Sequence, residues 1–151
     1  MSTTVRREAD TSGLEKKLHG KILGSGLPTV QALAFLGDAV HSLYVRRMLV
    51  KRGICKSGEL NEAALRYVTA EAQAKMYRRI EKMLLEDERD VFRRASNSTH
   101  LHKPKHASVA DYRHATGFEA VLGMLDWIKD EERLTELLDA AHMEDENDTE
   151  N

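Results

Sequence analysis

The chain has 151 residues, of which 41% are hydrophobic and 32% are charged, so its length fits one domain with a single apolar core. It has no run of about 18 apolar residues and no apolar stretch in residues 1–10, which argues against a membrane span and a secretory signal. The single cysteine suits a reducing compartment, and the formal net charge of −2, taken alone, argues against a protein that binds nucleic acid.

The N-terminal residues 1–26 are expected to form a flexible tail with one short helix, over residues 14–23. The folded domain is expected to span residues 27–143. Its first long helix is predicted to begin at Pro28, which suits a first helical turn, and to extend to about Arg52. Apolar residues recur along this segment at helical spacing, and Gly53 is expected to end it.

Three shorter helices are predicted to follow. Ser57 and Thr69 are expected to be the N-caps of two consecutive helices, because both precede segments with apolar residues at helical spacing. A third helix is expected to start at Asp87 and to end near Ala95. Residues 96–107 are polar and predict a long loop.

Two more helices are predicted in the C-terminal third. Ser108 is expected to cap a helix that reaches about Lys129, with Asp111 completing a variant capping box. The last amphipathic helix uses Leu134, Leu137, Leu138 and Ala141. No segment alternates with a period of two residues, so the sequence predicts an all-α domain of about seven helices.

The negative charge is concentrated at the C-terminal end. Residues 144–151 contain five carboxylates and no base, and we expect them to form a disordered acidic tail. Removing these five negative charges from the formal −2 leaves +3 on residues 1–143. Without the acidic tail the chain is therefore mildly basic, which permits a nucleic-acid partner.

Two carboxylates lie within the most apolar segments of two different helices. Asp38 belongs to the segment AFLGDAV at 34–40, and Glu119 belongs to the segment GFEAVLG at 117–123. A carboxylate in such a setting is costly unless it is paired or binds a metal. Gly37 and Gly123 accompany them, and glycine costs a helix about 1 kcal/mol relative to alanine. We therefore expect two backbones, or a backbone and a ligand, to come close together at these glycines.

The residue pattern leaves two interpretations of these carboxylates open. They could converge on one Mg²⁺ ion, which takes one or two carboxylates, several waters and the phosphates of a substrate. Such an ion would activate a water molecule and neutralise charge on a phosphodiester. Alternatively, each carboxylate could pair with an arginine at a helix crossing and have a structural role.

These segments resemble the catalytic domain of the ribonuclease III family. AFLGDAV at 34–40 resembles its signature motif, and YRHATGFEAVLG at 112–123 resembles its second acidic motif. LNEA at 60–63, AEAQA at 70–74 and RRASN at 93–97 follow the family pattern in the same order. The resemblance covers about residues 27–127 and is greatest to the mini-ribonuclease III subgroup, which has the catalytic domain alone.

The resemblance implies an all-α homodimer whose signature helices meet across the two-fold axis. It implies hydrolysis of double-stranded RNA that leaves 5′-phosphate and 3′-hydroxyl ends and depends on Mg²⁺, with Mn²⁺ as a substitute. Asp38 and Glu119 then correspond to the catalytic, metal-binding carboxylates. Ribonuclease III proper has a glutamate at the position of Ala34 and an aspartate at that of Thr116, and the mini subgroup shows similar losses.

The resemblance also implies a biological setting. The implied substrate is the stem of the large-subunit (23S) ribosomal RNA precursor in a bacterial cytoplasm, with a ribosomal protein as a helper. No membrane partner is expected.

A basic segment precedes Glu119 and is the predicted RNA-binding region. Residues 89–114 contain six lysines and arginines but only two aspartates. The predicted contacts to RNA are Arg93, Arg94, Asn97, Lys103 and Lys105. Arg93 and Arg94 also match a basic pair of the family. A solvated loop without a partner is the alternative, but the position of the loop just before the Glu119 helix favours RNA binding.

The sequence thus predicts a metal-dependent endoribonuclease that acts on double-stranded RNA. One alternative is a non-catalytic RNA-binding or ribosome-assembly protein on the same fold, in which the remaining acidic pair is too small a set for catalysis. A second alternative is a helical interaction module without a role in RNA metabolism.

Overall fold

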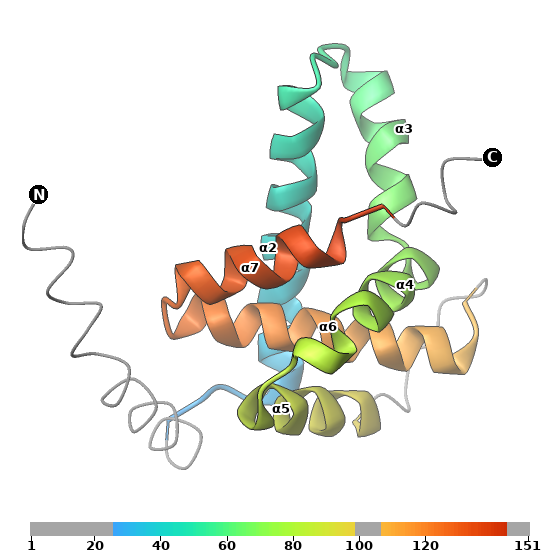
Figure 1. Cartoon of the computed structure of the whole chain (residues 1–151). Helices are drawn as coiled ribbons and strands as arrows, with labels where there is room; N and C mark the ends of the chain where they lie inside the picture. The colour runs from blue at the N-terminus through green and yellow to red at the C-terminus, as the bar shows by residue number, and fades with distance from the viewer. Residues whose placement is uncertain (1–25, 99–106, 145–151) are drawn as a thin grey trace, which may run out of the picture.

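The computed structural model describes residues 26–98 and 107–144, which form six α-helices and one 3₁₀ helix and contain no strand (Figure 1). The elements are α2 (Val30–Lys51), α3 (Ser57–Val68), α4 (Ala70–Ile80), η1 (Glu81–Met83), α5 (Glu86–Asn97), α6 (Val109–Trp127) and α7 (Glu131–Ala141). The predicted all-α class is confirmed. The helix expected at 14–23 and the C-terminal tail from residue 145 lie outside the described residues. No helix in the described part of the chain combines the length and apolar character that a lipid bilayer would require.

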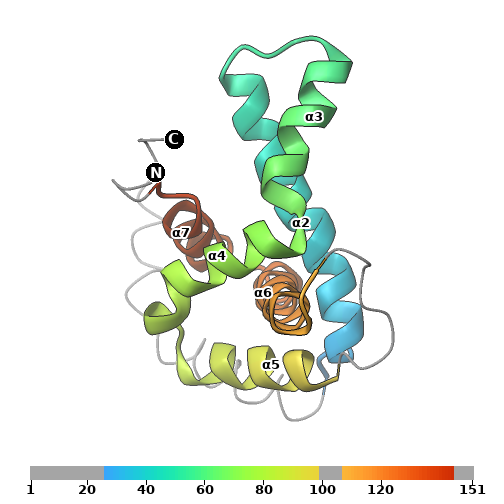
Figure 2. The ribbon, with the colours of Figure 1, turned by 90° about the vertical axis from the view of Figure 1, so that its right-hand side faces the viewer.

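Helix α6 is the centre of the domain. Figure 2 shows it nearly end-on, with α2, α4, α5 and α7 arranged around it. Its segment from Ala120 to Leu125 is buried on every side, as are Ala115, Gly117 and Phe118. A helix that is apolar all round is expected in such a position. The most extensive contact of the fold is the crossing of α2 with α6.

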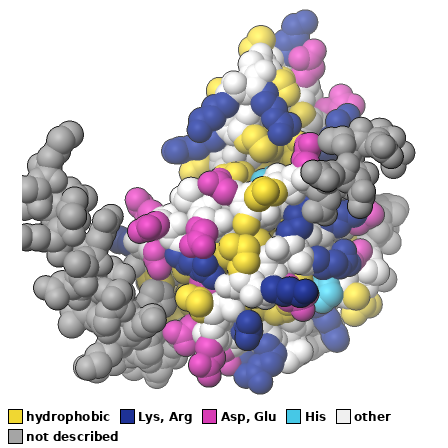
Figure 3. Space-filling model, viewed as in Figure 1, with side chains coloured by type: hydrophobic (Ala, Val, Ile, Leu, Met, Phe, Trp, Pro, Cys, Tyr) yellow, Lys and Arg dark blue, Asp and Glu magenta, His cyan; other side chains and the backbone are white. Residues whose placement is uncertain are grey.

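The C-terminal half of α2 and helix α3 project from this body as a helical hairpin (Figure 1). The turn between them contains Gly53 at a φ of +89°, a backbone conformation that favours glycine, so the expected end of the first helix is confirmed. Figure 3 shows Lys and Arg side chains along the projecting hairpin. Its exposed apolar residues include Leu43, Val50 and Leu65.

Three of the predicted helix starts need correction. Thr29 caps α2 by accepting a hydrogen bond from the Ala32 amide, at 3.2 Å, so Pro28 precedes the helix. The N-cap of α3 is Lys56, and Ser57 is its first helical residue. Helix α5 begins one residue earlier than Asp87.

The other two predicted caps are confirmed. The Thr69 hydroxyl accepts from the Ala72 amide at 3.2 Å, and the Ser108 hydroxyl accepts from the Asp111 amide at 3.0 Å. The Asp111 side chain is expected from the sequence to complete a variant capping box. Its carboxylate instead accepts a hydrogen bond from Arg78 of α4, at 3.3 Å. Local caps thus place the helix starts, and Asp111 ties α6 to α4.

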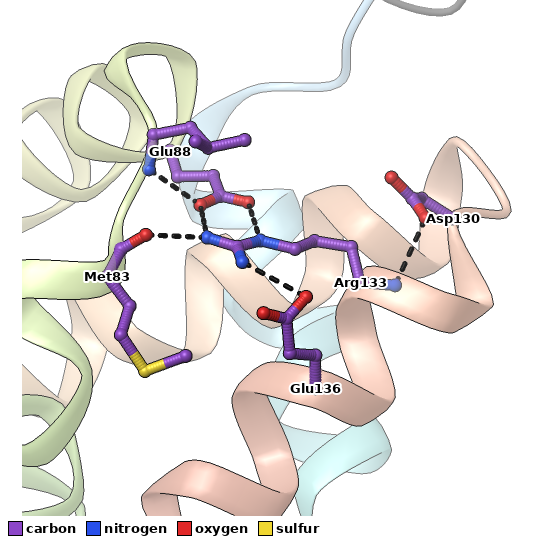
Figure 4. Close-up of polar contacts among 6 residues, drawn as sticks. Met83, Glu88, Asp130, Arg133 and Glu136 are labelled. Atoms are coloured by element: carbon purple, nitrogen blue, oxygen red, sulfur yellow. Dashed lines mark hydrogen bonds and ion pairs between the residues drawn. The ribbon is translucent and has the colours of Figure 1, made fainter. Parts of the chain in front are cut away.

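A buried ion pair joins α5 to α7 (Figure 4). Arg133 donates to both carboxylate oxygens of Glu88, at 3.0 Å and 2.8 Å, and to the Met83 carbonyl at 2.7 Å. Glu88 is only 3% exposed and also accepts from the Leu85 amide, at 2.8 Å. Because the carboxylate has three hydrogen bonds, the cost of burying its charge is compensated.

A second buried polar group joins α2, α4 and the end of α7. The His41 ring is fully buried, with its Nδ1 atom 3.1 Å from Nε2 of Gln73 and its Nε2 atom 2.9 Å from Nε2 of His142. Burial, and then the proximity of His142, lowers the pKa of His41 to about 3. His41 is therefore neutral at physiological pH and has a structural role in the core.

Candidate active site

Asp38 and Glu119 lie side by side at the crossing of α2 and α6. Asp38 is exposed on α2, and Glu119 is partly buried on α6. Their carboxyl groups share a hydrogen bond. The residues are 81 positions apart in the chain, so only the helix crossing brings them together.

Glycine allows this approach. A Cβ atom on Gly37 would overlap with the backbone carbonyl of Glu119 and would lie 3.0 Å from its Cα atom. A Cβ atom on Gly123 would overlap with the Leu33 carbonyl. The two glycines therefore remove the side chains that would keep the helices apart, and the predicted close approach of two backbones is confirmed.

The pairing of the two carboxyl groups changes the acidity of Glu119. Burial, then the negative charge of Asp38, then the hydrogen bond with Asp38, raises the pKa of Glu119 from 4.5 to about 9. Two carboxylates in contact cannot both be charged without a compensating cation, so one keeps its proton near neutral pH. Glu119 is the protonated member of the pair.

Neither carboxylate has an arginine partner among the described residues. Within residues 26–98 and 107–144, no ion pair joins a Lys or Arg side chain to Asp38 or Glu119. The described residues also hold no group of three or more metal-ligating side chains. The site thus consists of two oxygen donors, one exposed and one partly buried, and hard oxygen donors of this kind suit a divalent cation such as Mg²⁺.

The two positions at which the acidic residues of ribonuclease III are replaced have other roles here. Ala34 packs against the apolar core. Thr116 donates from its hydroxyl to the Tyr112 carbonyl one turn earlier, at 2.9 Å. Neither residue adds a charged ligand to the pair.

The apolar segment around Asp38 is not buried as a whole, which corrects the expectation that Asp38 faces apolar surroundings. Phe35 is 84% exposed and lies three residues before Asp38, on the same side of α2. Phe35 is not among the residues predicted to be functional from the sequence. Its spacing of three residues from Asp38 could have marked it, because this spacing places the apolar ring beside the carboxylate on one side of a helix.

Three of the five predicted RNA contacts lie on α5, where Arg93, Arg94 and Asn97 are all exposed. Arg93 donates a hydrogen bond to the Asp90 carboxylate at 2.8 Å, and Arg94 forms an ion pair with it at 3.3 Å. Exposed ion pairs contribute at most about 1 kcal/mol, so a phosphate could displace Asp90. The predicted contacts Lys103 and Lys105 lie outside the described residues.

The chain is similar to proteins of known family. Residues 31–126 match the model of the ribonuclease III domain. A mini-ribonuclease 3 of Streptococcus pneumoniae is 43% identical over 109 residues, which cover 71% of this chain and 85% of the relative. A mini-ribonuclease 3 of Symbiobacterium thermophilum is 44% identical over 109 residues, covering 72% of this chain and 84% of that relative.

A solved structure shares the fold. A crystal structure of a protein from Fusobacterium nucleatum has a TM-score of 0.68 and 30% sequence identity with this chain, covering 74% of this chain and 88% of the other. The resemblance of sequence and the helical fold that it implied are therefore confirmed.

Proposed function

The chain belongs to the ribonuclease III family of endoribonucleases, and we propose that it cleaves double-stranded RNA with a divalent cation held by Asp38 and Glu119. Mg²⁺ is the expected ion and Mn²⁺ its substitute. The observation that carries this proposal is the contact between the two carboxyl groups, with a raised pKa at Glu119 and no arginine partner among the described residues. If the two carboxylates had a structural role, each would be expected to pair with an arginine. A cation site instead needs carboxylate oxygens that are not occupied by such a partner.

Asp38 and Glu119 are proposed to have different roles at the site. Asp38 is exposed and would face the substrate, whereas Glu119 is held by α6 and would lose its proton if it became a ligand of the cation. When bound, the cation supplies the activation of a water molecule and the neutralisation of charge on the scissile phosphodiester. The glycine-mediated helix crossing keeps both oxygen donors at a fixed separation.

We also propose that two copies pair through α2. The exposed ring of Phe35 lies beside Asp38, and Leu43 and Val50 are exposed further along the same helix. Apolar side chains of this size on a helix surface are typical of a protein–protein contact. Pairing along α2 would place two Asp38 carboxylates in one assembly, as the resemblance implies.

Arg93, Arg94 and Asn97 on α5 are proposed to bind the phosphates and 2′-hydroxyls of the duplex, together with Lys103 and Lys105. Positive side chains and hydrogen-bond donors recognise A-form RNA by its backbone rather than by its sequence. From the resemblance to the mini subgroup we further propose the stem of the 23S ribosomal RNA precursor as substrate, in a bacterial cytoplasm, with a ribosomal protein as a helper.

The test is cleavage of a structured duplex RNA by the full chain in the presence of Mg²⁺, Mn²⁺ or EDTA. Asp38→Asn and Glu119→Gln are expected to bind the duplex and to lose cleavage, whereas Glu62→Gln, an exposed carboxylate on α3, is expected to cleave like the wild type. Wild-type protein that binds RNA without cutting it would indicate the non-catalytic alternative. Protein that neither binds nor cuts would favour an interaction module, and full activity in both site variants would refute the site assignment.

A further inference from the structure

A basic pocket lies at the base of the helical hairpin, away from the carboxylate pair. It has a volume of about 310 Å³ and is lined by the C-terminal end of α2, by α3 and α4, and by the residues that follow α7. Its lining includes four cationic side chains, those of Arg52, Arg66, Lys75 and Arg79. Glu144 is the carboxylate among the lining residues. The volume is at the lower end of the range for small-molecule sites, about 300–1,000 Å³.

Two of these arginines are held in place by hydrogen bonds. Arg52 donates to the Tyr67 hydroxyl at 3.0 Å, and Arg79 donates to the Ala141 carbonyl at 2.9 Å. No carboxylate in the described part of the chain forms an ion pair with Arg52, Arg66 or Lys75. Three cations around one concavity that have no ion-pair partner in the described part of the chain create a positive potential that attracts an anion.

The wall of the pocket adds a neutral ring to this charge. Burial, followed by the charge of Arg79, lowers the pKa of His142 to about 4, so the ring is neutral at physiological pH. Gln73 Nε2 donates to His41 Nδ1, and the Nε2 hydrogen of His41 then donates to Nε2 of His142. The hydrogen of His142 is thereby assigned to Nδ1, which is buried and has no hydrogen-bond partner within the described residues.

The pocket is distinct from the candidate active site. Met48 and Arg52 line it from α2, 10 and 14 residues after Asp38 on the same helix. At a rise of about 1.5 Å per residue, these positions lie about 15 Å and 21 Å along the helix from Asp38. A ligand in the pocket is therefore too far away to be coordinated by the carboxylate pair.

We propose that this pocket binds the phosphate groups of a nucleotide at a second site, independent of Asp38 and Glu119. Arginine guanidinium groups form paired hydrogen bonds with phosphate oxygens, and a lysine adds a point charge. The Tyr67 ring and the side chains of Met48 and Met76 provide apolar surface for a base or sugar. The nucleotide is either a free nucleoside phosphate or part of an RNA strand, and the two sources share the same phosphate chemistry.

The test is equilibrium binding by isothermal titration calorimetry with three probes: adenosine 5′-diphosphate, adenosine, and a single-stranded RNA pentanucleotide with a 5′-phosphate. The full chain is titrated with each probe up to about 1 mM. Arg66→Gln and Lys75→Gln each remove one charge at an exposed position of the pocket. Lys82→Gln removes one exposed charge outside it and is the matched control.

We expect the diphosphate or the phosphorylated RNA to bind, with adenosine at least tenfold weaker. Each pocket variant is expected to weaken binding by about tenfold or more, the effect of losing one charge-assisted hydrogen bond, while the control changes it by less than about twofold. Binding of the diphosphate identifies a free nucleotide as the ligand, and binding of the RNA probe alone identifies a strand phosphate. The proposal is overturned if neither the diphosphate nor the phosphorylated RNA binds, or if Lys82→Gln weakens binding as much as the pocket variants.

The independence of the two sites is tested separately. Asp38→Asn is expected to retain the wild-type affinity for the bound probe, whatever its effect on RNA cleavage. A loss of probe binding in Asp38→Asn would show that the probe occupies the carboxylate site and would overturn the second site. Because binding is read without catalysis, absence of cleavage in the wild type leaves this test intact.

Discussion

Replacement of Gly37 by alanine is expected to separate the two helices that carry the carboxylates. The added Cβ atom would overlap with the Glu119 carbonyl and would meet the Glu119 Cα atom at 3.0 Å. The obstacle is the backbone of a central helix, which cannot rotate away as the end of a flexible side chain can. Helices α2 and α6 must therefore move apart, and Glu119 moves away from Asp38.

The size of the effect follows from two opposing terms. Overpacking a core typically costs about 1–3 kcal/mol, and a backbone obstacle places this site at the upper end, about 3 kcal/mol. Alanine returns about 1 kcal/mol of helix propensity relative to glycine. The net loss in the free energy of unfolding is about 2 kcal/mol, which lowers the Tm of a chain of this length by about 4–8 °C.

Urea and thermal unfolding, followed by circular dichroism at the helix band, measure this loss, and cleavage of duplex RNA measures the displacement of the site. Gly58→Ala is the matched control, because a Cβ atom on Gly58 in α3 meets nothing within 4 Å. It is expected to keep full activity and to gain up to about 1 kcal/mol. If Gly37→Ala were as stable as the wild type or gained as Gly58→Ala does, the close crossing of α2 and α6 would be refuted.

Three further predictions concern buried charge. Arg133→Met leaves the Glu88 carboxylate buried without its partner and is expected to cost about 3–5 kcal/mol in urea unfolding, whereas the double variant Glu88→Leu/Arg133→Met should lose far less; equal losses would contradict the ion-pair explanation. Since the pKa values of His41 and His142 are lowered from 6.5 to about 3 and about 4, the unfolded chain takes up protons that the folded chain excludes, so the contribution of these two histidines to stability should be constant above pH 6.5 and fall as the pH drops from 6.5 toward 4. The difference in stability between the wild type and His142→Phe should therefore change below pH 6.5 and stay constant above it; a difference that is independent of pH would refute this. Because the pKa of Glu119 is raised to about 9, metal-free wild-type protein should lose stability as the pH rises from 4.5 to 9 while Glu119→Gln does not, and Mg²⁺ should raise the Tm of the wild type only; a similar rise in the variant would place the ion elsewhere.

The helix positions were largely predictable because caps and apolar spacing are local properties. Thr69 and Ser108 accept hydrogen bonds from amides three residues ahead, which a sequence pattern can represent. The buried face of α2 was less accessible to such reasoning. Its buried row contains Gly37 and His41, which no count of apolar residues identifies, whereas Leu43 at an apolar position is exposed.

The candidate site shows the same division. The pattern of residues marked Asp38 and Glu119 as unusual and the glycines as points of close approach, but it left the partner of each carboxylate open. Their contact depends on the angle at which two distant helices cross, which is a property of the packed core. The link between Glu88 and Arg133 was missed for the same reason, since each is an ordinary charged residue within its own helix.

The central position of α6 has a consequence for biosynthesis. Among the described helices, α2, α4 and α5 contact α6 extensively, and α6 begins only at Val109, so these three helices leave the ribosome before the surface that covers them exists. Their apolar faces remain open during that interval, when an emerging chain is prone to aggregate or to be held by chaperones. The domain is therefore expected to fold in one late step, after residues 109–127 have been released, rather than helix by helix during synthesis.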